Sequence, residues 1–389
     1  MKKTYHCLLV AAISVLSIVL IPTFLVAVQN EQNETEQEDP TQGFEEWQRL
    51  EVQPMIAVME NALLGNPTNT DQSFELTPDF LKGGEGFTYV PFSVTFDREA
   101  LGFSPLEPEM VAVYLFVTEH LENSGQPEIV TDVAEEEQQV DPLASVEIPK
   151  AVFEDVYFID ISGQIAIPSG QLLDRISISR AFTVPGGEYD VYVAIRKSKG
   201  ELTSPDEVPP DEVPPNEVPP TVLLFSQQVS VPGLWTTELR SSSVIVAADL
   251  SVLALPLDAE EQIKNPYTLG TTQIIPKIGR EFSKAEELSV VLLVYNAQLT
   301  SEQAPDVIVE YNFYQKTNDG EEFFNKTNPQ EFNKQTLPGF DASLGHQIVS
   351  GQAVPMRVFP IGAHRLEITV NDNAAGTSLI REVNFIVQE

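Results

Sequence analysis

Residues 89–96 read Tyr-Val-Pro-Phe-Ser-Val-Thr-Phe, and Phe92, Val94 and Phe96 alternate along them on one face. A period of two is typical of a β-strand with one face in a hydrophobic core. Long helical periods are absent, and short apolar segments bounded by Gly, Pro, Asp and Asn recur at 110–117, 156–161, 176–182, 189–195, 243–248, 288–295, 307–314, 364–370 and 380–387. The sequence therefore predicts an all-β chain of antiparallel β-sandwiches, not a doubly wound α/β enzyme fold.

The two halves of this strand pattern resemble each other. Residues 111–121 match 289–299 as an apolar strand that ends in polar residues, and 184–193 match 359–368, where Pro and Gly precede an aromatic ring that opens a strand. Each half closes with a last strand, at 222–231 or 380–387. We therefore expect a duplicated domain, with one sandwich at 74–232 and another at 233–389. A length of about 150 residues suffices for an independent core, so modest contact is expected, with Trp235 at the joint.

The N-terminus predicts export. Lys2 and Lys3 precede an uncharged apolar run at 8–28, which fits a cleaved signal peptide or a retained membrane anchor. We assign 1–28 to this segment and leave cleavage open. Residues 29–73 then form an acidic linker followed by a short helix at 54–64, with Pro54 at the first helical position and Gly65 beyond the last.

Charge and cysteine content exclude several classes of function. The chain carries 22 basic and 58 acidic residues, and its formal net charge of −36 repels nucleic acid and anionic lipid. Membrane contact is thus expected only through the N-terminal segment. Because Cys7 is the single cysteine and precedes the apolar run, a cysteine nucleophile, a redox pair and thiolate metal sites are excluded.

No sequence motif indicates catalysis. His120, His346 and His364 are far apart in the sequence, and no nucleophile elbow, Walker motif or dinucleotide glycine motif occurs. The run Asn371-Asp372-Asn373 is interpreted as an Asx-type turn in preference to a calcium site. We therefore expect a non-enzyme with no catalytic, cofactor-binding or metal-binding residues and no cofactor.

A Pro-rich insertion at 205–220 contains the pentapeptide Asp-Glu-Val-Pro-Pro twice, followed by Asn-Glu-Val-Pro-Pro. Each Pro-Pro pair forbids a helix and favours polyproline II. A recognition strip is one interpretation. We favour a repeat expansion tolerated in an exposed loop, because lengthening a loop costs only about 0.6 kcal/mol per doubling.

Two short motifs carry a family resemblance. Gly-x-Tyr-x-Val at 187–191 and Gly-x-His-x-Leu at 362–366 resemble the start of the penultimate strand of immunoglobulin-like sandwiches, where a tyrosine corner ties the strand to the preceding loop. His364 departs from tyrosine. Residues 362–387 also resemble the closing hairpin of uncharacterised secreted bacterial proteins, including acidobacterial ones. The resemblance implies an immunoglobulin-like fold and an exported location, and no activity.

These observations together predict an exported, non-catalytic binding or structural module. It would lie in the periplasm, on the cell surface or outside the cell, with an unidentified protein or glycan as partner. One alternative is a carbohydrate-binding module, which needs exposed coplanar aromatic rings and has Trp47 and Trp235 as candidates. A carboxylate-dependent hydrolase is a further alternative, since acidic residues are abundant although no pair stands out.

Overall fold

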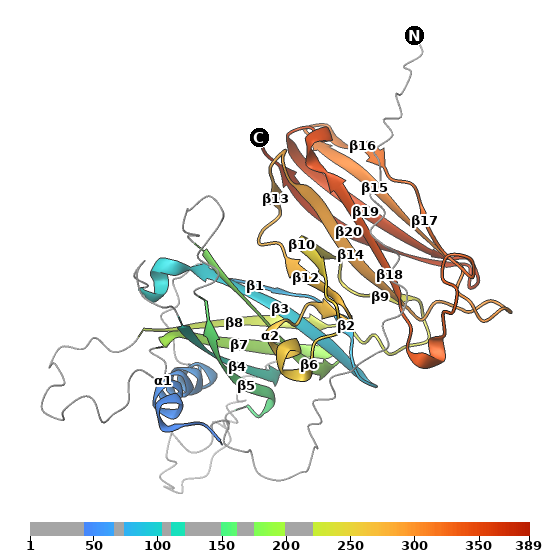
Figure 1. The fold of residues 1–389 in the computed structure, drawn as a ribbon. Helices are drawn as coiled ribbons and strands as arrows, with labels where there is room; N and C mark the ends of the chain where they lie inside the picture. The colour runs from blue at the N-terminus through green and yellow to red at the C-terminus, as the bar shows by residue number, and fades with distance from the viewer. Residues whose placement is uncertain (1–42, 66–73, 103–109, 121–148, 162–174, 199–220) are drawn as a thin grey trace, which may run out of the picture.

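A computed structural model describes residues 43–65, 74–102, 110–120, 149–161, 175–198 and 221–389. Within these ranges β-strands dominate, and they form two sandwiches that follow one another along the chain (Figure 1). The predicted all-β fold is confirmed. The export segment at 1–28, the acidic linker at 29–42 and the Pro-rich insertion at 205–220 lie outside the described residues.

The first sandwich consists of two four-stranded sheets. One sheet contains β1 (Glu75–Pro78), β2 (Leu81–Lys82), β3 (Phe87–Asp97) and β6 (Arg175–Pro185). The other has the order β5 (Ala151–Asp160), β4 (Met110–Glu119), β7 (Gly187–Ser198) and β8 (Val222–Val231). Phe92, Val94 and Phe96 are buried in the core between the sheets, as their alternation predicts.

The second sandwich consists of two six-stranded sheets. One contains β9 (Arg240–Ser241), β10 (Ile245–Val252), β11 (Thr268–Leu269), β12 (Thr272–Pro276), β14 (Glu287–Tyr295) and β18 (Ile348–Pro355). The other contains β13 (Glu281–Phe282), β15 (Val307–Thr317), β16 (Gly320–Lys326), β17 (Gln330–Phe332), β19 (Gly362–Asp372) and β20 (Thr377–Val387). The strand pairs are antiparallel throughout the described residues, except for the short parallel pair of β13 with β20.

Strand connections in both halves are those of an immunoglobulin-like sandwich. The chain changes sheet between β3 and β4, returns for β6, and changes again for β7. The second half repeats this order with β14, β15, β18 and β19. Crossings of this kind place the penultimate strand between its neighbours in one sheet, as β7 lies between β4 and β8 and β19 between β15 and β20.

Helix α1 (Glu46–Leu63) begins eight residues before the predicted start at 54. The backbone N–H of Glu45 donates to Gln48 Oε1 at 2.9 Å, and Pro54 lies inside the helix instead of at its start. The hydrogen bond that Pro54 cannot donate would have gone to Leu50, an exposed residue. Burial of Val52 and Met55 against the sheet outweighs this loss, a tertiary effect that local signals do not contain.

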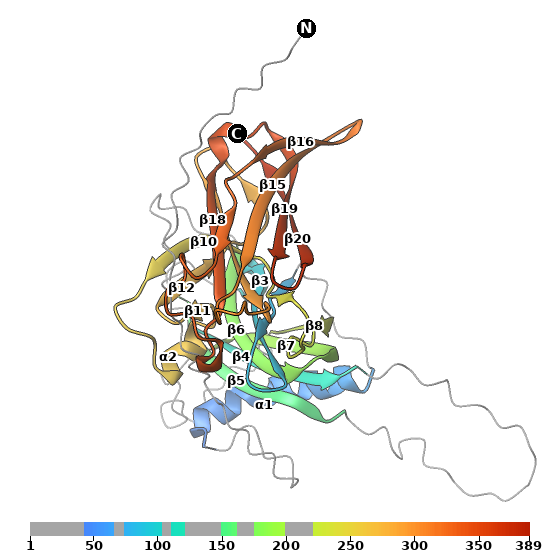
Figure 2. The same ribbon diagram turned by 90° about the vertical axis from the view of Figure 1, so that its right-hand side faces the viewer.

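Helix α1 covers the outer face of the β5-β4-β7-β8 sheet, and Figure 2 shows it beneath the first sandwich. The buried guanidinium of Arg196 on β7 donates to the carbonyl of Glu51 at 2.9 Å. A second helix, α2 (Ala259–Lys264), is short and exposed. Neither α1 nor α2, the α-helices of the described ranges, has the length and hydropathy that crossing a membrane requires.

Strand pairing corrects one of the two predicted sequence matches. The match of 184–193 with 359–368 places β7 on β19, which occupy the same position in their sandwiches. The match of 111–121 with 289–299 places β4 on β14, and this match is wrong. Strand β14 pairs with β10 and β18, as β3 pairs with β1 and β6, so the counterpart of β4 is β15.

Candidate functional site

The two sandwiches meet through the connection between β1 and β2, which lies against the start of β10. The N–H of Phe80 donates to Ser243 Oγ, and the N–H of Ser243 donates to the carbonyl of Phe80, both at 3.0 Å. The N–H of Lys82 donates to the hydroxyl oxygen of Tyr295 at 3.2 Å. These bonds fix the edge of the first sandwich to one sheet of the second.

An apolar cluster lies beside these hydrogen bonds. Its buried members are Leu81 from the first sandwich, Leu234 from the connecting segment, and Ile245, Ala247, Tyr267, Ile274, Val291, Leu293 and Tyr295 from the second. Trp235 does lie at the joint, with its indole N–H donating to the carbonyl of Phe87 at 3.1 Å, but it is 44% exposed. The contact is therefore broader than the sequence indicates, and the buried members of its apolar cluster are residues other than Trp235.

The segment that connects the sandwiches is held closely. Thr88 Oγ1 donates to the carbonyl of Pro232 at 2.7 Å. Gly186, in the turn between β6 and β7, lies directly under Gly233, because a Cβ added at Gly186 would approach the Gly233 nitrogen to 2.6 Å. Only glycine fits at this crossing.

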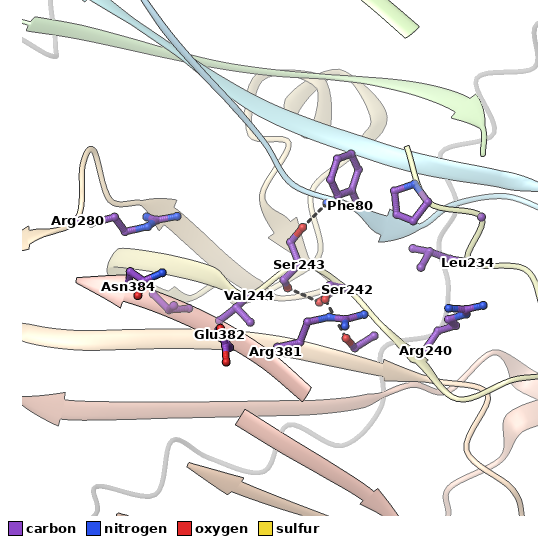
Figure 3. A pocket seen from close by; sticks show the side chains of 14 residues that line it. Phe80, Leu234, Arg240, Ser242, Ser243, Val244, Arg280, Arg381, Glu382 and Asn384 are labelled. Atoms are coloured by element: carbon purple, nitrogen blue, oxygen red, sulfur yellow. Dashed lines mark hydrogen bonds between the residues drawn. The ribbon is translucent and has the colours of Figure 1, made fainter. Parts of the chain in front are cut away.

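A cavity of about 740 Å³ opens at this junction. Its lining comes from Phe80, the connecting residues 232–234, residues 240–244, Arg280 and residues 381–384. Figure 3 shows Arg280, Arg381 and Arg240 spaced along the cavity, with Phe80 across from Arg381 and Arg240. We refer to this cavity as the arginine cleft.

Three structural elements bring the arginines together. Arg240 lies on β9, Arg280 immediately precedes β13, and Arg381 lies on β20. Parallel pairing of β13 with β20, together with the hydrogen bond from the N–H of Ile386 to the carbonyl of Arg280, places Arg280 beside the C-terminal end of β20, whereas Arg381 lies near the middle of that strand. No spacing pattern in the sequence indicates this group, because the three residues are far apart in the chain.

The positive charge of the cleft is incompletely neutralised by the described residues. Arg240 pairs with Glu238 at 2.6 Å, whereas neither Arg280 nor Arg381 has a carboxylate of the described ranges within 4.0 Å. The Arg280 guanidinium donates to the carbonyl of Gly279 at 3.4 Å, and the Arg381 guanidinium donates to the carbonyl of Ile380 at 3.1 Å. Burial, and then the charge of Arg240, lower the pKa of Arg381 from its ordinary value.

The acidic side chain in the cleft lining is used elsewhere. Glu382 accepts from Arg365 Nη1 at 2.6 Å, and Arg365 also pairs with Glu321 and Glu367 on the outer face of the same sheet. Glu382 is therefore a partner of Arg365 and does not balance Arg381. In a chain of net charge −36, the cleft is a locally cationic site.

A buried carboxyl group adjoins the cleft. Asp79 Oδ2 accepts from the Tyr267 hydroxyl at 3.1 Å, and the next residue, Phe80, lines the cavity. Burial raises the pKa of Asp79 to about 6, and the Tyr267 hydrogen bond and the charge of Arg280 oppose this rise. No sequence pattern had distinguished this aspartate from the other acidic residues.

The three histidines of the described residues remain apart. His120 pairs with Asp190 at 2.9 Å, His346 Nδ1 accepts from the N–H of Asp341, and His364 is buried among phenylalanine rings. Within the same ranges, no group of three His, Cys, Asp or Glu side chains could hold a metal ion. None of the histidines lines the arginine cleft.

Asp372 forms the turn that its sequence run predicts. Its Oδ1 accepts from the N–H groups of Ala374 and Ala375 at 3.1 Å, and its Oδ2 accepts from the N–H of Gln298 at 2.7 Å. Hydrogen bonds of this kind characterise Asx-type turns. The carboxylate is thus used to hold the loop in place.

Both penultimate strands carry the corner hydrogen bond. The Tyr189 hydroxyl donates to the carbonyl of Pro185 at 3.0 Å, and His364 Nε2 lies 2.9 Å from the carbonyl of Pro360. Each bond spans four residues, so the imidazole of His364 takes the place of the phenol. Histidine therefore preserves the corner that the sequence motif predicts.

The two tryptophans also have structural contacts. Trp47 packs edge-on against Phe158 with ring centroids 5.0 Å apart, and Lys82 Nζ lies 4.2 Å from the ring centre of Trp235. One ring contacts β5 from α1 and the other lies at the joint. They belong to separate contacts, and neither observation favours a shared flat platform for a sugar.

No family model and no curated protein matches this chain. Among solved structures, it is similar to trypsin-activated α2-macroglobulin of Escherichia coli, with 11% identity, coverage of 81% of this chain and 16% of that one, and a TM-score of 0.19. It is also similar to an immunoglobulin-like protein of Pseudomonas aeruginosa, with 14% identity, coverage of 38% and 97%, and a TM-score of 0.19. A third similar structure is dimeric latent PorU of Porphyromonas gingivalis, with 9% identity, coverage of 83% of this chain and 22% of that one, and a TM-score of 0.24.

The chain thus spans about a sixth of the length of the E. coli α2-macroglobulin. Such low TM-scores carry no information on function, and the assignment of immunoglobulin-like sandwiches rests on the strand pairing described above.

Proposed function

We propose that the protein is an exported, non-catalytic binding module that holds its ligand in the arginine cleft. The observation that carries the proposal is a cavity of about 740 Å³ lined by three arginines at a domain interface. Binding sites for small molecules are commonly cavities of about 300–1,000 Å³ and often lie between domains. The basic N-terminus and the apolar run at 8–28 support export.

Contacts of the lining side chains support binding over catalysis. Ser241 Oγ donates to the carbonyl of Ser242 at 3.0 Å, and Ser242 Oγ donates to the carbonyl of Ser243 at 2.6 Å. Ser242 Oγ also accepts from the N–H of Leu293 at 2.9 Å. Activation of a serine requires a nearby base, and none of the histidines that the structure describes lines this cleft. The serines are therefore used in backbone contacts at the junction.

Crosslinking inside cells tests this proposal. A photoreactive amino acid placed at Asn384, which lines the cleft, should capture a ligand in the bacterial envelope fraction. The matched control carries the same amino acid at Phe323, which is 58% exposed and lies on β16 outside the cleft. We expect an adduct by mass spectrometry at position 384 only. Equal labelling at both positions, or none at either, would contradict a ligand site in the cleft.

Turnover is tested separately. A ligand released from the captured protein should have an unchanged mass after prolonged incubation with fresh protein. Conversion to a product would contradict the non-catalytic part of the proposal.

A further inference from the structure

The arginine cleft has two chemically different parts. Arg240, Arg280 and Arg381 supply positive charge, and the half-buried Phe80 and Val244 supply apolar surface. Leu234, also in the lining, is buried. A ligand that fits both parts needs an anionic group and an apolar body.

Arginine chemistry decides what the charged part can hold. A guanidinium presents its N–H donors in a planar fork that matches the oxygens of carboxylate, phosphate and sulfate. The Nε atom of Arg240 is buried and has no hydrogen-bond partner among the described residues, so it has a donor still to satisfy. A buried donor without an acceptor is unfavourable, and an acceptor on a ligand would satisfy it.

Repulsion between two arginines of the cleft also favours an anionic ligand. Arg240 and Arg381 lie close enough that the charge of Arg240 lowers the pKa of Arg381. An oxyanion between the two guanidinium groups replaces their repulsion with charge-assisted hydrogen bonds. The charged part therefore favours an anion over a neutral or cationic ligand.

The net charge of the chain favours a small anion over an acidic polymer. At −36 the molecule as a whole repels a polyanion, whereas a molecule with one or two negative charges interacts mainly with the nearby arginines, within a Debye length of about 8–10 Å. A cavity of about 740 Å³ also suits a small molecule.

We propose that the arginine cleft binds a small organic acid, with its carboxylate held by Arg381 and Arg240 and its apolar body against Phe80 and Val244. This inference rests on the proposed function, because it names the ligand class of the same cleft. Arg280 extends the positive surface and sits near the buried Asp79, which links the cleft to the contact between sandwiches.

Calorimetric titration of the full chain tests the inference with four probes at constant ionic strength. Phenylacetate carries the carboxylate and an apolar ring, phenylacetamide is its neutral counterpart, inorganic phosphate lacks the apolar body, and a glutamate-rich peptide represents an acidic polymer. We expect phenylacetate to bind at least tenfold more tightly than each of the other three. Equal binding of phenylacetamide would overturn the anionic part, and equal binding of phosphate the apolar part. Preferred binding of the peptide would assign the cleft to an acidic polymer instead.

Variants locate the site. Arg381→Ala should weaken phenylacetate binding at least tenfold, and Arg381→Lys should restore part of it, because lysine keeps the charge and loses the fork. Lys334→Ala is the matched control. Lys334 pairs with Glu302 on the surface, so this substitution removes one positive charge at a position outside the cleft. Should Arg381→Ala fail to fold, Arg240→Gln with its unfolding curve replaces it. Equal loss in the Arg381 or Arg240 variant and in the Lys334 variant would overturn the assignment.

These results are separable from a failure of the proposed function. Capture at position 384 without phenylacetate binding would overturn the organic acid while leaving the cleft a ligand site. Absence of both would overturn the two proposals together.

Discussion

The two sandwiches have the same strand pairing, but the sheet whose outer face is covered by another element differs between them. In the first, the outer face of the β5-β4-β7-β8 sheet lies under α1, with Tyr114 and Phe116 of β4 in the contact. In the second, the covered sheet is the opposite one, where Val291 and Leu293 of β14 face the first sandwich. Strand β15, the true counterpart of β4, alternates between buried and half-buried residues.

This difference explains why β4 and β14 look alike in sequence. A strand covered on both faces becomes a continuous apolar run, whatever its position in the sheet. Residues 111–117 and 290–295 are such runs, because a second element covers each strand on its outer face. A continuous apolar sequence thus indicates that both faces of a strand are buried. Turn motifs such as those before β7 and β19 indicate instead where the strand lies in its sheet.

Removal of α1, which covers the first sandwich, should have the largest effect. Val52, Met55 and Met59 of α1 are almost fully buried, and together they stabilise the contact by roughly 5–9 kcal/mol, comparable to the stability of a whole domain. A chain that begins at residue 74 should lose the calorimetric transition of the first sandwich, and a chain that begins at residue 43 should keep it. Identical melting of the two chains would show that α1 is dispensable.

The second prediction compares adjacent residues on β14. Leu292 lies in the core of the second sandwich and Leu293 in the interdomain cluster. Leu292→Ala should cost roughly 2–5 kcal/mol of global stability, the usual scale for a buried leucine. Leu293→Ala should instead speed hydrogen exchange at the amides of Phe80 and Ser243, which bond across the interface. The same exchange pattern in both variants would mean that the two faces are not separately covered.

The third prediction compares the turns before β7 and β19. Gly186 lies under Gly233, whereas Ile361 occupies the matching position and is 54% exposed. Gly186→Ala should cost roughly 1–3 kcal/mol in urea unfolding, as expected of an overpacked contact. Ile361→Ala should stay within about 0.5 kcal/mol of the unmodified protein. A neutral Gly186→Ala would show that the connecting segment can shift.

The smallest effect concerns the two corner hydrogen bonds. Tyr189→Phe should cost about 1 kcal/mol, the net value of one hydrogen bond, at any pH between 5 and 8. The bond of His364 should depend on pH. Burial lowers the pKa of His364, so the unfolded chain binds the proton first. The stabilisation that neutral His364 provides is complete above a pH of about 6.5, and it is lost as the pH falls through the lower pKa of the folded state.

Unfolding curves at several pH values test this contrast. In His364→Tyr the free energy of unfolding should fall less steeply as the pH decreases. In Tyr189→Phe the dependence of this free energy on pH should be unchanged. Asp79 contributes a slope of opposite sign, because its raised pKa of about 6 makes the folded state bind the proton first. Each variant is therefore compared with the unmodified protein at the same pH. An unchanged acid slope in His364→Tyr would contradict the role of His364.

Local patterns predicted most of the long strands, the corner motifs and the turn at Asp372, because each depends on residues close in the sequence, but they did not predict β16 or β18. The start of α1 was missed because burial of Val52 against the sheet determines it, and this contact is not local. The arginine cleft was missed for the same reason. Its three arginines are assembled by β9, β13 and β20, and only the completed sheets bring them together.

The tightly held connection at Pro232 and Gly233 also has a mechanical consequence. With Thr88 bonded to Pro232 and Gly186 packed under Gly233, we expect the junction to resist bending. Free rotation of one sandwich against the other would first have to break these contacts. We therefore expect a force applied to one sandwich to be transmitted to the other.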